Sequence, residues 1–208
     1  DNLVKAILPN PSNNGVIVIY HEESFMGVSL NMVSVSEDGE VSTQMSLCSD
    51  CENPNYESHA IGDNEFIVTF RLTSSSLASG VYSQIFSYTG EMLGDSNGTL
   101  IADEINDQRS SDITYNSEID EYLVCWNDGR DSFVNDEGDE VADLNILCSR
   151  LTYDENLILS DEIYVAYIQG SQQQDPSVFS THLGTYLIGW EDMRSASEID
   201  QSLNLSFE

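Results

Sequence analysis

The residues of this sequence that could do chemistry are mostly carboxylates, and they are densest in one segment. That segment contains Asp128, Asp131, Asp136 and Asp139. Closely spaced carboxylate oxygens are hard ligands of the kind that Ca²⁺ prefers, so these four residues are a predicted calcium site. The spacing differs from an EF-hand loop because Gly138 stands at the wrong position. A solvated acidic loop is the alternative interpretation.

The four cysteines offer a second kind of chemistry. Cys48 and Cys51 have the spacing of a zinc knuckle or a redox pair, but a structural zinc site needs a second such pair. Cys125 and Cys148 are not spaced in that way, and no βαβ pattern supports a thioredoxin-like site. We therefore predict two disulfides, Cys48–Cys51 and Cys125–Cys148, with four buried free thiols as the alternative.

The sequence contains no pattern that is typical of a catalytic site. It lacks a Gly-x-Ser-x-Gly elbow and a phosphate-binding glycine loop. His59 and His182 precede similar apolar runs, which indicates a repeated position more than an active site. We predict no catalytic residue and no cofactor other than Ca²⁺. The possibility that two carboxylates form a glycoside hydrolase site stays open, because the chain has many acidic residues.

The charge balance limits the partners of the protein. Asp and Glu total 37 against 6 Lys and Arg, which gives a formal net charge of −31. Binding to nucleic acid or to an anionic membrane needs a basic face, so neither is expected. Membrane insertion is not expected either, because no apolar stretch approaches the roughly 20 residues that span a bilayer. Cations, a salty medium or basic partners fit the charge better, and glycans are possible partners if the protein binds ligands.

The elements that must position these residues follow a repeated pattern. A strand-like run that ends in an aromatic residue and then acidic residues occurs four times, at residues 16–22, 66–71, 122–130 and 186–194. A second alternating run and a polar turn follow most copies, and a shorter strand precedes the later ones. No segment has sustained helical periodicity. Each unit is therefore expected to hold about four short antiparallel strands.

This repeat predicts an all-β, four-bladed β-propeller-like domain that occupies residues 1–208 as a single unit of folding. The expected blades are roughly residues 1–48, 49–104, 105–168 and 169–208, and the last is incomplete. An irregular β-sandwich and a solenoid of hairpins are the alternative architectures.

The later copies carry a family resemblance. The segments Asp175-Pro176-Ser177-Val178, Trp126-Asn127-Asp128-Gly129-Arg130 and Trp190-Glu191-Asp192-Met193-Arg194 resemble a Trp-x-Asp-x-Arg-type repeat of secreted bacterial and archaeal surface proteins. In the first two units Tyr20 and Phe70 stand in place of the tryptophan. The resemblance implies a propeller blade and an extracellular or cell-surface location, and it implies no reaction.

The N-terminal run has three interpretations that the sequence leaves open. Leu3, Val4, Ile7 and Leu8 resemble the strand that the fourth unit lacks. This run could close the ring by completing the last blade, or it could open the first unit. It could also be donated to a neighbouring copy, which would link subunits into a filament.

The main functional prediction is a non-enzymatic extracellular structural or adhesive protein, assembled as a homo-oligomer or filament by exchange of terminal strands. The alternative is a carbohydrate- or ligand-binding β-propeller, and a glycan hydrolase ranks third. Asn97 and Asn204 each begin an N-glycosylation sequon, which fits a secreted glycoprotein.

Overall fold

The computed structural model describes residues 2–24, 27–47, 54–72, 80–103, 108–134 and 138–194. Throughout this part of the chain the regular structure is β-strand, as the two-residue alternation predicts. The strands form four separate antiparallel sheets, each built from a continuous stretch of sequence. The prediction of an all-β protein is confirmed.

The first sheet pairs its strands in chain order. It contains β1 (Asn2–Asn10), β2 (Gly15–Ser24), β3 (Gly27–Val35) and β4 (Met45–Ser46). The second sheet repeats this meander with β5 (Asn55–Ile61), β6 (Glu65–Leu72), β7 (Gly80–Ser87) and β8 (Met92–Leu93). A further strand, β9 (Thr99–Asp103), pairs with β7 beyond β8.

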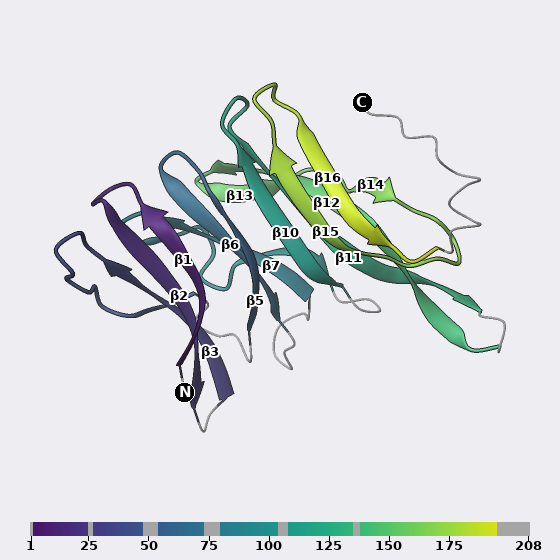
Figure 1. The fold of residues 1–208 in the computed structure, drawn as a ribbon, viewed down its shortest axis with the longest axis horizontal. Helices are drawn as coiled ribbons and strands as arrows, with labels where there is room; N and C mark the ends of the chain where they lie inside the picture. The colour runs from purple at the N-terminus through teal and green to yellow at the C-terminus, as the bar shows by residue number, and fades with distance from the viewer. Residues whose placement is uncertain are drawn as a thin grey trace.

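The third sheet has the same strand order, and the described part of the fourth sheet contains two antiparallel strands. The third contains β10 (Arg109–Asn116), β11 (Glu121–Val134), β12 (Glu140–Asp154) and β13 (Asn156–Leu159), with β14 (Ile163–Ala166) also paired to β12. In the fourth sheet the described strands are β15 (Gln173–Ser180) and β16 (Tyr186–Asp192). The four sheets follow one another along the long axis of the molecule, with the first and fourth at opposite ends (Figure 1).

Each pair of successive sheets encloses its own apolar core. Leu8, Ile17 and Met32 of the first sheet pack with Phe66 and Phe86 of the second. The next core joins the second and third sheets around the fully buried Trp126. The last core joins the third and fourth sheets and contains the cysteines of β11 and β12. Burial of both faces of the inner sheets therefore fixes the order of the stack.

The acidic segment after Trp126 is mostly strand, so the expectation of a long acidic loop there is wrong. β11 continues to Val134 and β12 begins at Glu140. Phe133 pairs with Val141 across this extension, and such apolar cross-strand pairs stabilise a hairpin.

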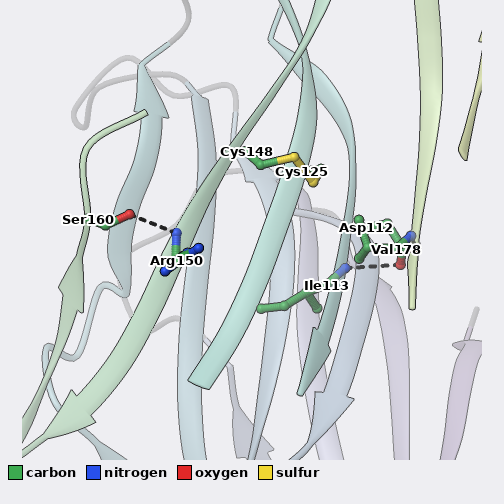
Figure 2. Close-up of a disulfide and its surroundings, with 7 residues drawn as sticks. All are labelled: Asp112, Ile113, Cys125, Cys148, Arg150, Ser160 and Val178. Carbon is green, nitrogen blue, oxygen red and sulfur yellow. Dashed lines mark hydrogen bonds between the residues drawn. A yellow bond between two sulfur atoms is a disulfide. The ribbon is translucent and has the colours of Figure 1, made fainter. Parts of the chain in front are cut away.

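Cys125 and Cys148 form a disulfide between β11 and β12, as the sequence predicts (Figure 2). The two residues are direct cross-strand partners, and both are fully buried between the third and fourth sheets. Cys48 and Cys51, the second predicted pair, lie outside the described residues.

Removal of this disulfide should lower stability without changing the fold. The bond closes a segment with a sequence separation of 23 residues. In the chain-entropy treatment a loop of this size contributes about 3 kcal/mol, so a Cys125→Ala/Cys148→Ala double variant should lose about that amount. Urea unfolding followed by circular dichroism measures the difference, with the wild-type protein under reducing conditions as the control. An unchanged midpoint would contradict the stabilising role.

Candidate functional site

The first strands of three successive sheets lie next to one another, and each carries a β-bulge at the same level. The register shifts between Tyr56 and Ser58 in β5, between Arg109 and Asp112 in β10, and between Gln174 and Ser177 in β15. A bulge leaves backbone N–H groups without a ladder partner and re-aims the neighbouring side chains. The three bulges therefore place unpaired amides and polar side chains together.

Two of the bulges contain a residue with positive φ that is not glycine. Ser110 has φ 50° and Asp175 has φ 51°. Residues other than glycine are uncommon in this left-handed region, although Asp is enriched there. Such a conformation persists only where the surroundings hold it, and here Ser110 N donates to the Glu57 carboxylate and Asp175 N donates to Asn127 Oδ1.

Glu57 of the second sheet binds the bulge of the third. Its carboxylate accepts hydrogen bonds from Ser110 N at 3.1 Å and Ser111 N at 2.8 Å. The Ser111 hydroxyl donates to the same carboxylate. Burial raises the pKa of Glu57, and the hydrogen bonds from Ser111 and Ser110 oppose that rise.

Asp112 of the third sheet binds to both neighbouring sheets. It accepts a hydrogen bond from the Ser58 hydroxyl at 2.6 Å and another from Val178 N at 2.8 Å. Ile113 N donates to it at 3.0 Å. Figure 2 shows Asp112 and Ile113 beside Val178, near the disulfide. One carboxylate thus connects the second, third and fourth sheets.

An open polar cleft lies where the three bulges meet. Its volume is 480 Å³, and its walls are the bulges of β5, β10 and β15 together with Asn55. Asp175 is exposed there, and its backbone N–H donates to Asn127 Oδ1 at 2.9 Å. The cleft therefore contains two carboxylates bound by main-chain donors and one exposed carboxylate.

A smaller groove of 250 Å³ continues between β5 and β10 and is lined by His59 and Tyr115, among others. Tyr56 Oη lies 2.6 Å from His59 Nδ1. Burial, with a smaller effect of Asp112, raises the pKa of Tyr56 to about 12, so the phenol is the donor. Burial lowers the pKa of His59, which keeps the imidazole neutral as the acceptor.

Of the four predicted calcium ligands, the structure describes Asp128, Asp131 and Asp139. Asp128 is buried and paired with Arg130 at 2.6 Å, and it also accepts from Trp126 Nε1 at 3.2 Å. Asp131 lies further along β11, Asp139 precedes β12, and Asp136 is outside the described residues. Within the described ranges no group of three or more Asp, Glu, His or Cys side chains could hold a metal ion.

The Asp/Arg pairs of the repeat have a local structural role. Arg130 N donates to Asp128 Oδ1 at 3.1 Å, and Arg194 N donates to Asp192 Oδ1 at 3.0 Å. Arg130 also contacts Glu162 at 2.7 Å in the segment before β14. These charge-assisted hydrogen bonds fasten a strand end to a neighbouring segment.

The N-terminal run opens the first unit, which is one of the three alternatives that the sequence left open. β1 pairs with β2 in antiparallel register, from Asn2 opposite Glu22 to Asn10 opposite Gly15. Leu8 is buried in the first core, whereas Leu3, Val4 and Ile7 are exposed.

The remaining predicted residues are scattered. Asn97 lies half-buried in the turn between β8 and β9, and Asn204 is outside the described residues. Of the two tryptophans, Trp126 is fully buried and cannot contact a ligand, whereas Trp190 is 39% exposed. Trp190 falls in β16 at the register position opposite the Asp175 bulge.

Sequence reasoning missed the residues that define the cleft. Glu57 and Asp112 precede the aromatic strands and carry no motif of their own. The available signal was the short polar run before each aromatic strand, which combines acidic residues with serine in β5, β10 and β15.

Comparison with known proteins gives one distant structural likeness. No family model and no curated protein matches the sequence. Among solved structures, an endo-1,5-alpha-L-arabinanase from Thermotoga petrophila RKU-1 aligns with 10% sequence identity and a TM-score of 0.47. The alignment covers 89% of this chain and 51% of that one, so the chain spans about half the length of its neighbour.

This comparison contradicts the main functional prediction. A structural or adhesive protein, including a self-assembling filament subunit, was expected, whereas the aligned protein is by its name an endo-1,5-alpha-L-arabinanase. The prediction of a structural or adhesive protein is therefore not carried further. Among the described residues, no helix is long and apolar enough to cross a membrane.

Replacement of Asp112 should destabilise the protein more than replacement of Asp175. Asp112→Ala leaves Val178 N and the Ser58 hydroxyl without their acceptor. Because unsatisfied buried donors are costly, we expect a loss of about 2 to 3 kcal/mol in the free energy of unfolding. Asp175→Asn, which keeps a residue that tolerates positive φ, should cost less than about 0.5 kcal/mol. Urea unfolding of both variants makes the comparison, and equal losses would contradict the connecting role of Asp112.

Stability should fall as the pH is lowered below 6.5, through two histidines. Burial lowers the pKa of His21 and of His59 from 6.5. The unfolded chain then binds protons at a higher pH than the folded chain, so their contribution is present above pH 6.5 and lost below it.

The free energy of unfolding, measured between pH 5 and pH 8, tests this for His59. His59→Gln keeps an acceptor for Tyr56 and should reduce the pH dependence, whereas His182→Gln, at an exposed position in the β15–β16 turn, should leave it unchanged. The same pH dependence in wild type and His59→Gln would contradict the assignment.

Proposed function

We propose that this protein is an extracellular carbohydrate-binding protein with a four-bladed β-propeller-like arrangement, and that the cleft between β5, β10 and β15 is its ligand site. The observation that carries the proposal is the cleft itself: a 480 Å³ polar space lined by three adjacent bulges. Open, polar clefts with fixed hydrogen-bonding groups suit ligands that are rich in hydroxyl groups.

The hydrogen-bonding capacity of the cleft supports a polyol ligand. An ionised carboxylate has about four acceptor positions. Glu57 accepts from Ser110 N, Ser111 N and the Ser111 hydroxyl, which leaves it about one position. Asp112 likewise uses three positions. Each carboxylate can therefore accept one more hydrogen bond, from a hydroxyl group of the ligand. The main-chain donors already fix the orientation of each carboxylate.

The exposed members of the cleft provide the adaptable contacts. Asp175 and Asn55 are exposed, and with Ser177 they present acceptors and donors to a bound sugar. The half-exposed Trp190 falls opposite the Asp175 bulge in the register of the fourth sheet and offers an apolar edge nearby. The acidic character of the cleft disfavours phosphorylated ligands and nucleic acids.

Binding fits the cleft better than hydrolysis. A glycoside hydrolase needs one carboxyl group that is protonated and free to donate. In this cleft three donors already point at the Glu57 carboxylate, so its oxygens are occupied even though burial raises its pKa. Asp112 is occupied in the same way, so neither residue is free to act as a general acid.

The extracellular location is supported by the Cys125–Cys148 disulfide, because disulfides persist mainly in oxidising compartments. The propeller-like arrangement is supported by the order of the sheets, in which successive meanders share apolar cores and the first strands β5, β10 and β15 of the last three sheets lie side by side (Figure 1).

A glycan array followed by titration calorimetry tests the proposal. Neutral oligosaccharides that bind on the array should bind Asn55→Ala and Asp175→Asn about tenfold more weakly, since the first change removes a polar side chain and the second replaces a charged acceptor by a neutral amide. Asp154→Asn alters an exposed acid on β12, away from the cleft, and should bind as the wild type does. Equal binding by all variants would place the ligand elsewhere, and release of shorter sugars during incubation would show a hydrolase instead.

A further inference from the structure

Two carboxylates face each other on the extension of the β11–β12 hairpin. Asp131 and Asp143 are direct cross-strand partners, just beyond the irregularity that follows Asp128. Residues paired in this way have their side chains on the same face of the sheet, with Cβ atoms roughly 5 Å apart. Like charges at such a position destabilise a sheet unless a third group separates them.

Asp143 is buried and incompletely bound. Only 1% of its surface is exposed. Its Oδ2 accepts from Gly170 N at 3.3 Å, but its Oδ1 is buried without a hydrogen-bond partner among the described residues. The donors that reach the carboxylate are main-chain amides of Gly170 and Ser171, and no ion pair joins it to a described Lys or Arg.

A second buried oxygen without a partner belongs to a neighbour of this residue. Gln173 is 0% exposed, and its Nε2 donates to the Ser171 hydroxyl at 2.9 Å. Its Oε1 has no partner within the described part of the chain. Ser171 thus connects Gln173 to Asp143. On the other side, the hydroxyl of Tyr167 hydrogen-bonds to Asp131.

An unpartnered carboxylate oxygen in the interior is costly, and so is an unpartnered amide oxygen. A bound cation would bind these acceptors and remove the repulsion between the two carboxylates. All the available ligands are oxygen atoms, which selects a hard cation, and the mixture of carboxylates, amide and hydroxyl suits the flexible coordination of Ca²⁺.

We propose that Asp131 and Asp143 bind a Ca²⁺ ion, with Asp143 Oδ1 as the buried ligand and water molecules completing the coordination. Gln173 Oε1, whose side chain is linked to Asp143 through Ser171, is a further candidate ligand. The proposal is independent of the carbohydrate cleft. It differs from the ligand set predicted from the sequence, with which it shares only Asp131, since Asp128 is bound by Arg130.

Thermal unfolding in EDTA and in excess Ca²⁺ tests the site. Binding to the folded state alone should raise the wild-type Tm by roughly 5 °C at saturating Ca²⁺. Asp143→Asn and Asp131→Asn should each lose this shift. Asp154→Asn on the same strand should keep it, because Asp154 is exposed and lies far along β12 from Asp143.

A second readout keeps the test valid if Asp143→Asn fails to fold. Tb³⁺ replaces Ca²⁺ in oxygen sites, and its emission is sensitised by a nearby tyrosine, here Tyr167. Wild-type protein should show this emission, excess Ca²⁺ should quench it, and Tyr167→Phe should reduce it while leaving the Ca²⁺-induced Tm shift in place. Absence of a Tm shift in the wild type, or an equal shift in Asp131→Asn, would overturn the proposal.

Discussion

The need to bind main-chain amides at the bulges of β10 and β15 is the constraint on which the arrangement of the last three sheets depends. A bulge frees N–H groups from the strand ladder, and buried N–H groups require an acceptor. Glu57 and Asp112 supply acceptors across the gaps between sheets, to Ser110 and Ser111 in one direction and to Val178 in the other. These bonds align β5, β10 and β15 side by side. The same residues that hold the sheets together therefore form the walls of the polar cleft.

Apolar packing between successive sheets stabilises the stack in addition to these polar connections. Each core is shared by two successive sheets, so each sheet depends on its neighbours to bury its apolar faces. This is the energetic pattern of repeat proteins, in which stability is a sum of unit and interface terms. The polar connections determine the lateral position of each sheet, and the apolar faces provide the free energy that holds the stack together. The cleft is accordingly built on packed strands, which gives it a fixed shape.

Local patterns in the sequence predicted the strands, because alternation of side chains has a direct physical cause in the two faces of a sheet. The pairing of Cys125 with Cys148 was also predicted, and the two cysteines are cross-strand partners in the hairpin of β11 and β12. The site could not be predicted in this way. Asp112 functions through Val178, which is 66 residues further along the chain, and no local pattern encodes that contact. The prediction of an acidic loop after Trp126 was wrong for a related reason. The density of charge favoured a loop, whereas the cross-strand pair of Phe133 and Val141 extends the hairpin.

The composition of the chain explains why main-chain amides and hydroxyl groups, and not basic side chains, bind Glu57 and Asp112. With 6 Lys and Arg against 37 Asp and Glu, ion pairs can serve only a minority of the acidic groups. Two of the arginines are used locally, on Asp128 and Asp192. A carboxylate in the interior must then find N–H or O–H donors, and Glu57 and Asp112 find three each. Asp143 receives fewer, with one oxygen left over. In a protein so short of internal cations, that remaining acceptor is where a cation from solution would contribute most.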